Sequence, residues 1–69
     1  MRTVKYRIEV WGTVGPNTNM TEFKKYEYEY GLFHCFMVME NTCYAIIETT
    51  QGEVIEKKLD DIEFIKNLN

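Results

Sequence analysis

The sequence predicts an all-β fold, a small antiparallel barrel of five to six short strands with one helical turn near residues 59–62. Two patterns support this prediction: apolar and polar residues alternate with a period of two, and clusters of turn-forming residues separate the alternating segments. The chain has one alanine, Ala45, and no long segment with the 3.6-residue period of a helix. At 69 residues it is expected to form one domain, 1–69, and barrel closure would remove exposed strand edges.

The first half of the chain contains three predicted strands. Arg2 to Trp11 alternates with one set directed inward, namely Val4, Tyr6, Ile8 and Val10. Glycine, proline and asparagine then indicate an exposed loop over residues 12–21. A second strand is expected over Glu22 to Tyr30. Gly31 interrupts it, and the apolar run Leu32 to Met39 predicts a central strand covered on both faces, followed by a turn at residues 40–42.

The second half predicts strand, turn, strand, helical turn and strand in close succession. Cys43 to Thr50 and Glu53 to Lys58 are expected to pair across a two-residue turn at Gln51-Gly52. Asp60 and Asp61 are expected to cap a helical turn over residues 59–62. A last short strand follows at residues 64–65, and residues 66–69 are expected to fray.

Charge and composition restrict the classes of function. Eight basic and eleven acidic residues give a net charge of -3, with +3 in residues 1–25 and -6 in residues 26–69. This balance does not suit the backbone of duplex DNA or RNA. No apolar segment approaches the ~20 residues that a membrane span needs, so a cytoplasmic location is expected.

The residues that could carry chemistry predict no catalytic, metal or disulfide site, and no cofactor. In the expected hairpin, Cys43 lies four or five positions from the partner of Cys35, more than ~10 Å away, so both thiols are expected to be reduced and buried. His34 and Cys35 are adjacent and are expected to face opposite sides of a strand, which excludes a thiol–imidazole pair. Instead, His34 is expected opposite Glu48 or Thr49.

Several short motifs resemble known small proteins. The hairpin, helical turn and last strand look like the C-terminal half of SH3-like barrels. Gly31-Leu32-Phe33-His34, Ala45-Ile46-Ile47-Glu48 and Gly52-Glu53-Val54-Ile55-Glu56 resemble β-rich proteins encoded by bacteriophages and prophages of low-GC Gram-positive bacteria. The resemblance covers about residues 31–65. The resemblance implies a bacterial host and this fold. It implies no particular activity, because such phage proteins mostly lack a known one. Abundant Phe, Tyr, Ile, Asn and Lys also indicate an AT-rich genome.

Aromatic side chains are the remaining candidates for function. Tyr26, Tyr28 and Tyr30 form a stripe on one face of a strand, and Trp11 and Phe33 would extend it. An exposed stripe predicts a non-enzymatic module that binds a protein or a second copy of itself, since tyrosine and tryptophan give large, stiff contact areas. The alternatives are that these rings fill the core, or that they stack on nucleic-acid bases with help from Lys5, Arg7, Lys24 and Lys25.

Overall fold

The structure is a computed structural model that describes residues 1–16 and 19–66. These residues form five antiparallel strands in one sheet and a single short 3₁₀-helix. In chain order the elements are β1 (Thr3–Thr13), β2 (Thr21–Met39), β3 (Thr42–Thr49), β4 (Val54–Lys58), η1 (Leu59–Asp61) and β5 (Ile62–Phe64). The predicted all-β antiparallel class is therefore confirmed, with five strands.

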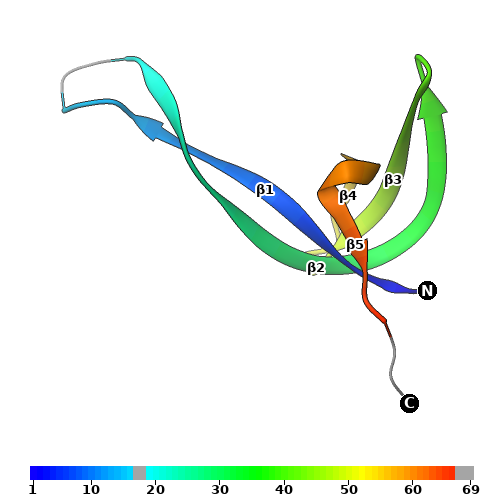
Figure 1. The fold of residues 1–69 in the computed structure, drawn as a ribbon. Helices are drawn as coiled ribbons and strands as arrows, with labels where there is room; N and C mark the ends of the chain where they lie inside the picture. The colour runs from blue at the N-terminus through cyan, green and yellow to red at the C-terminus, as the bar shows by residue number, and fades with distance from the viewer. Residues whose placement is uncertain (17–18, 67–69) are drawn as a thin grey trace.

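The sheet is open but strongly curved. Its strand order is β4-β3-β2-β1-β5, and no ladder between β4 and β5 is present in the described part of the chain. In a flat sheet these two edge strands would lie about 19 Å apart. However, η1 joins them with three residues, which at a rise of ~2 Å each span much less. The sheet must therefore curl until its edges approach each other, as Figure 1 shows.

β2 is one continuous strand of 19 residues rather than the two strands predicted on either side of Gly31. Its first half pairs with β1 and its second half with β3 (Figure 1). Gly31 pairs with Val4 on one side and with Thr49 on the other. A Cβ at this position would lie 2.7 Å from the backbone oxygen of Glu48. The point where β2 lies between β1 and β3, which we call the crossing, therefore requires a glycine. Gly31 thus joins the two halves of β2 instead of separating two strands.

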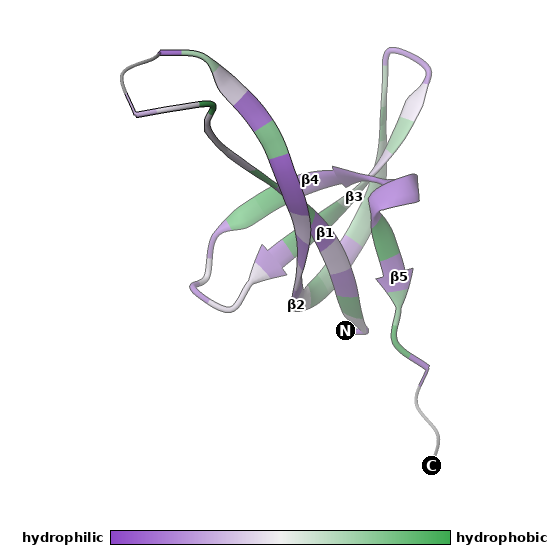
Figure 2. Ribbon diagram, turned by 60° about the vertical axis from the view of Figure 1, so that its left-hand side comes forward, coloured by the Kyte–Doolittle hydropathy of each residue, from purple (hydrophilic) through white to green (hydrophobic). Residues whose placement is uncertain are grey.

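We call the outer part of the β1–β2 hairpin the arm, formed by residues 7–13 and 21–30. Within the described residues, β5 pairs with β1 only at residues 4–6 and β3 pairs with β2 only from Gly31 onward. The arm is therefore a two-stranded ribbon that extends away from the rest of the sheet (Figures 1 and 2). The radius of gyration is 14.9 Å, against about 11 Å for a compact domain of this length.

The loop at the tip of the arm is shorter than the predicted residues 12–21. β1 continues to Thr13 and β2 begins at Thr21. The backbone N–H of Val14 donates a hydrogen bond to the carbonyl of Met20 at 3.0 Å, which closes the base of the loop. Residues 17 and 18 of the expected loop lie outside the described residues.

The core is small and lies inside the curve of the sheet. Four hydrophobic side chains are buried among the described residues: Val4, Tyr6, Ala45 and Ile47. Partly buried residues from the other strands surround them, namely Ile8, Phe33, Ile55, Ile62 and Phe64. The predicted inward direction of Val4 and Tyr6 is confirmed. The prediction that residues 32–39 are covered on both faces is wrong, because Val38 is 70% exposed and Phe36 is also exposed.

The turns of the second half differ from the prediction in detail. Glu40 and Asn41 both have positive φ and form a two-residue turn, so Thr42 already belongs to β3. β3 and β4 are joined by residues 50–53, where Gly52 has a φ of 83°. The helical turn is confirmed, but the described structure gives it no side-chain cap. Asp61 instead accepts a hydrogen bond from Arg7.

The end of the chain also departs slightly from the prediction. β5 comprises Ile62–Phe64 rather than residues 64–65. This strand begins directly after η1 and pairs with β1. Of the tail expected to fray, Lys66 is described and has no regular secondary structure. Residues 67–69 of that tail lie outside the described residues.

Candidate protein-interaction surface

One face of the arm is aromatic because of the register between its strands. Trp11 pairs with Phe23, Glu9 with Tyr26 and Arg7 with Tyr28. Opposite residues in an antiparallel pair share a face, and so do residues two positions apart. We therefore define the aromatic face by its five rings, Trp11, Phe23, Tyr26, Tyr28 and Tyr30.

The aromatic face points to solvent and away from the core. Its five rings are all exposed, and Trp11 and Tyr28 keep 55% of their surface accessible. Trp11 meets Phe23 edge to face with ring centroids 5.8 Å apart, and Phe23 lies 4.7 Å from Tyr26. The interpretation of the tyrosine stripe as core is therefore wrong. The rings support one another at the end of the arm and still present a wide surface.

Basic side chains lie over two of the tyrosines. The guanidinium of Arg7 sits 4.1 Å from the ring centre of Tyr26, and the ammonium of Lys5 sits 4.9 Å from that of Tyr28. Arg7 also donates a hydrogen bond to Asp61 at 2.6 Å, and this bond raises the pKa of Arg7. Such contacts hold rings in fixed positions through the attraction of a cation to the ring face. The Asp61 contact also anchors the base of the arm to η1.

The opposite face of the arm carries charged side chains beside the apolar Ile8 and Val10. Lys25 and Glu27 form an ion pair at 3.2 Å, and Lys24 pairs with Glu22 at 2.6 Å. Glu29 accepts a hydrogen bond from the Tyr6 hydroxyl at 3.0 Å. Burial of the ring, followed by this hydrogen bond and the negative charge of Glu29, raises the pKa of Tyr6 to about 12. Neither face of the arm is covered along its outer part, since residues 21–30 are all exposed.

Phe33 does not belong to the aromatic face, which corrects one predicted site residue. It pairs with Ile47 and packs on the core side against Phe36 and Phe64, with ring centroids 4.8 and 5.1 Å away. Arg2 lies over the ring of Phe64 at 4.3 Å. Phe33 lies three positions after Tyr30 in the continuous strand β2, so period-two alternation already directs its side chain to the face opposite the tyrosines. Four of the five predicted residues, Trp11, Tyr26, Tyr28 and Tyr30, do share a surface.

Phe23 is the residue of this face that the sequence pattern did not indicate. The period-two alternation would place Phe23 opposite in direction to Tyr26, because the two are three positions apart. The register shifts between Val10 and Trp11, so that Lys24 becomes an extra residue in β2. This bulge restores Phe23 to the face of Tyr26. The residues around Lys24 gave no distinctive signal for this bulge.

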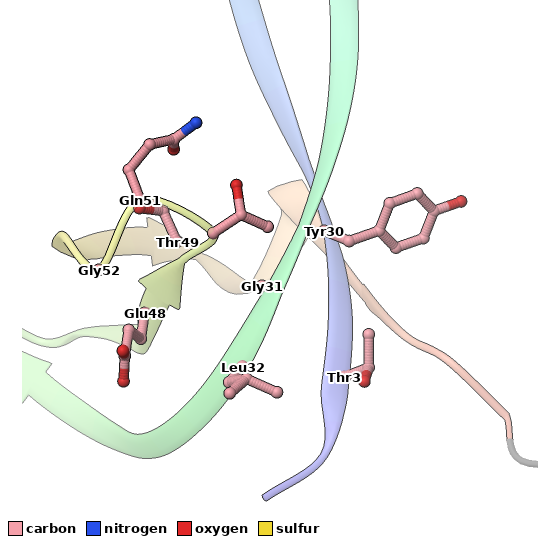
Figure 3. A pocket seen from close by; sticks show the side chains of 9 residues that line it. Thr3, Tyr30, Gly31, Leu32, Glu48, Thr49, Gln51 and Gly52 are labelled. Carbon is pink, nitrogen blue, oxygen red and sulfur yellow. The ribbon is translucent and has the colours of Figure 1, made fainter.

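A hollow of about 550 Å³ adjoins the aromatic face at the base of the arm. Tyr30 and Leu32 line it from β2, and the end of β3 and the following turn line its other side. Figure 3 shows Thr3 and Tyr30 on one side of the β1–β2 crossing and Glu48, Thr49 and Gln51 on the other. The hollow opens where β3 diverges from β2, next to the unpaired edge of the arm.

The residues considered for chemistry lie apart from this surface. Cys35 and Cys43 are both free, but neither is fully buried as expected: Cys35 is exposed and Cys43 is partly buried. His34 contacts Glu48 at 3.0 Å, which confirms the predicted cross-strand contact. Because His34 is the bulge residue, it shares the outer face with Cys35 instead of opposing it. No hydrogen bond joins these two side chains in the part of the chain that is described.

The comparisons with known proteins leave the arm and hollow as the main guides to function. No protein-family model, curated protein or solved structure matches this chain. Residues 1–16 and 19–66 contain no group of three or more acidic, histidine or cysteine side chains placed to hold a metal ion. Over the same residues, no helix has the length and apolar character needed to cross a membrane.

Proposed function

We propose that this chain is a non-enzymatic module that binds a protein through the aromatic face of the arm. The observation that carries the proposal is the exposure of five neighbouring rings on a ribbon that projects from the sheet. Aromatic residues dominate the energetically important centres of protein interfaces, because stiff rings lose little entropy on binding. Lys5 and Arg7 hold two of these rings in place before a partner arrives.

The proposal includes the class of fold and the biological setting. The strand order β4-β3-β2-β1-β5, with a 3₁₀ turn linking the two edge strands, supports an SH3-like barrel. The motifs within residues 31–65 resemble phage and prophage proteins of low-GC Gram-positive bacteria. We place the chain among such accessory proteins, acting in the cytoplasm of a bacterial host.

The chemistry of the face indicates what kind of partner segment it suits. The rings offer apolar area, and the tyrosine hydroxyls and the indole N–H offer polar tips. The indole N–H of Trp11 already donates to Glu9 at 3.0 Å, and Arg7 is neutralised by Asp61. A largely apolar, uncharged segment with side chains that pack on rings fits this surface better than a polyanion does.

Site-specific crosslinking tests the proposal. A photoreactive phenylalanine in place of Tyr28 should crosslink one host protein in cells, whereas the same group in place of Glu56 on β4 should not. With that protein purified, Tyr28→Ala should weaken binding at least tenfold, whereas Glu56→Ala should leave the dissociation constant unchanged. Circular dichroism of both variants should match that of the original chain. Equal binding by folded Tyr28→Ala would contradict the proposal.

A nucleic-acid binding assay distinguishes a protein partner from the alternative partner, a single-stranded nucleic acid. The aromatic face with Lys5, Arg7, Lys24 and Lys25 would have to bind single strands by stacking and charge. We expect no gel shift of single-stranded DNA or RNA at low salt. A salt-sensitive shift that Tyr28→Ala removes would overturn the protein assignment in favour of a nucleic-acid-associated regulatory module.

A further inference from the structure

We infer that two copies of this chain pair along the open edge of β2, strand to strand and antiparallel, in a register centred on Tyr26. The starting observation is that residues 21–30 of β2 are all exposed and pair on one side only, with β1, among the described residues. Two-stranded ribbons are marginally stable in water, and open edges readily accept another strand. The inference concerns self-pairing and does not depend on the proposed protein partner.

The charges along the edge favour this antiparallel register over those centred on Lys25, Glu27 or Tyr28. With Tyr26 at the two-fold axis, Lys25 of each copy lies opposite Glu27 of the other, which gives two opposite-charge pairs. A register centred on Lys25 or on Glu27 places that residue opposite its own copy. A register centred on Tyr28 places Glu27 opposite Glu29. Each of these alternatives sets like charges directly across the strands, which is destabilising.

The chain exposes more surface than a compact domain of its mass, as expected for a chain with an uncovered edge. The chain exposes 5548 Å², about 1,000 Å² more than a compact monomer of 8.3 kDa. A stable interface covers about 800 Å² on each partner. The two ion pairs within β2, Lys25–Glu27 and Lys24–Glu22, are exposed and can rearrange at little cost. Pairing would also direct the start of β2 from each copy toward the hollow beside Tyr30 of the other.

Self-pairing would change the binding surface itself. A two-fold axis perpendicular to the sheet keeps the aromatic faces of both copies on the same side. The joined ribbon would have the strand order β1-β2-β2-β1, with the two Tyr26 rings adjacent at its centre. The two aromatic faces would therefore become one continuous surface. Charges from the opposite face of the arm, including Lys25 and Glu27, would hold the two β2 edges in register.

Charge reversal with light scattering tests the pairing. The chain should have twice the 8.3 kDa mass at high concentration. Lys25→Glu and Glu27→Lys should each weaken the dimer about tenfold, because each creates two like-charge contacts. The double variant restores opposite charges and should restore the dimer. A monomer at every concentration, or a dimer insensitive to Glu27→Lys with an intact circular dichroism spectrum, would overturn the inference.

Disulfide trapping tests the register independently of charge. In a chain with Cys35→Ser and Cys43→Ser, Tyr26→Cys places two thiols directly opposite, within the ~4.4–6.8 Å between Cα atoms that a disulfide needs. Mild oxidation should give a covalent dimer. Tyr28→Cys is the matched control, since its two copies would lie about 13 Å apart. Faster crosslinking at position 28 than at position 26 would refute the register.

Discussion

At the scale of single residues, Gly31 and Tyr6 connect the arm to the core. Gly31 lies where β2 changes partners, with no room for a side chain between Ile47 and the backbone of Glu48. Tyr6 fills the space on the core side of the same crossing and reaches Glu29 with its hydroxyl. Substitution of Gly31, or ionisation of Tyr6, should therefore lower the free energy of unfolding.

Gly31→Ala should destabilise the fold. The added Cβ would lie 2.7 Å from the Glu48 carbonyl oxygen and 2.7 Å from a methyl group of Ile47, and the carbonyl belongs to the β2–β3 ladder. We expect a loss of about 1–3 kcal/mol in the free energy of unfolding, measured with urea. Gly12→Ala is the control, because its Cβ would meet only the flexible side chain of Lys24. Equal stability of the two variants would contradict the proposed tight crossing.

Tyr6 should make stability depend on pH in the alkaline range. Its pKa rises from 10.0 to about 12 in the folded chain, so folding favours the neutral phenol. This stabilisation is complete below the unfolded pKa and is lost as pH rises from about 10 to 12, a change of roughly 2–3 kcal/mol. Tyr6→Phe cannot ionise and should show a smaller decline in urea unfolding over the same range. Parallel pH profiles for the two chains would rule out this role.

At the scale of elements, β1 and β2 show what the alternation of the sequence can predict and what it cannot. Period-two alternation correctly predicted β1, with Val4 and Tyr6 inward, and it predicted the stripe of three tyrosines. It missed the bulges at Lys24 and His34. A bulge adds one residue without a distinctive local composition, and packing of the neighbouring strands decides where it forms. For this reason Phe23 joins the aromatic face. Phe33 instead lies on the opposite face because it is three positions from Tyr30, which the alternation itself indicates.

The solvent exposure of the second half of β2 also could not be predicted from the sequence. The apolar run from Leu32 to Met39 is typical of a strand covered on both sides, but coverage depends on what the rest of the chain supplies. Here the connecting elements are short, and no described helix packs across the outer face of β2. The turn residues, in contrast, were predictable, because Gly52 and the pair Glu40-Asn41 occupy tight connections.

The β2–β3 turn contains a residue whose replacement should stabilise the fold. Glu40 has a φ of 51°, a conformation that costs an ordinary side chain about 1 kcal/mol and that asparagine tolerates. Glu40→Asn should therefore raise the melting temperature by about 4 °C, measured by circular dichroism. Glu56→Asn, at an exposed position in extended β4, is the control and should give no increase. A fall in melting temperature for Glu40→Asn would contradict the turn geometry.

At the scale of the whole molecule, a small core coexists with a large exposed surface. Only four hydrophobic side chains are buried among residues 1–16 and 19–66, and all four belong to β1 and β3. The arm contributes little to this core, yet it makes up much of the length of the molecule (Figure 1). Stability therefore depends mainly on the curved part of the sheet, whereas binding is assigned to the arm.

The pairing of β1 with β5 constrains the order in which the chain can fold during synthesis. Val4 pairs with Phe64, close to the opposite end of the chain. The β1–β2 hairpin needs only early residues, whereas the core side of β1 remains uncovered by β5 until Ile62 and Phe64 leave the ribosome. Contacts between distant parts of a chain also form slowly. The β1–β2 hairpin can thus form, and present the aromatic face, before the interior is complete.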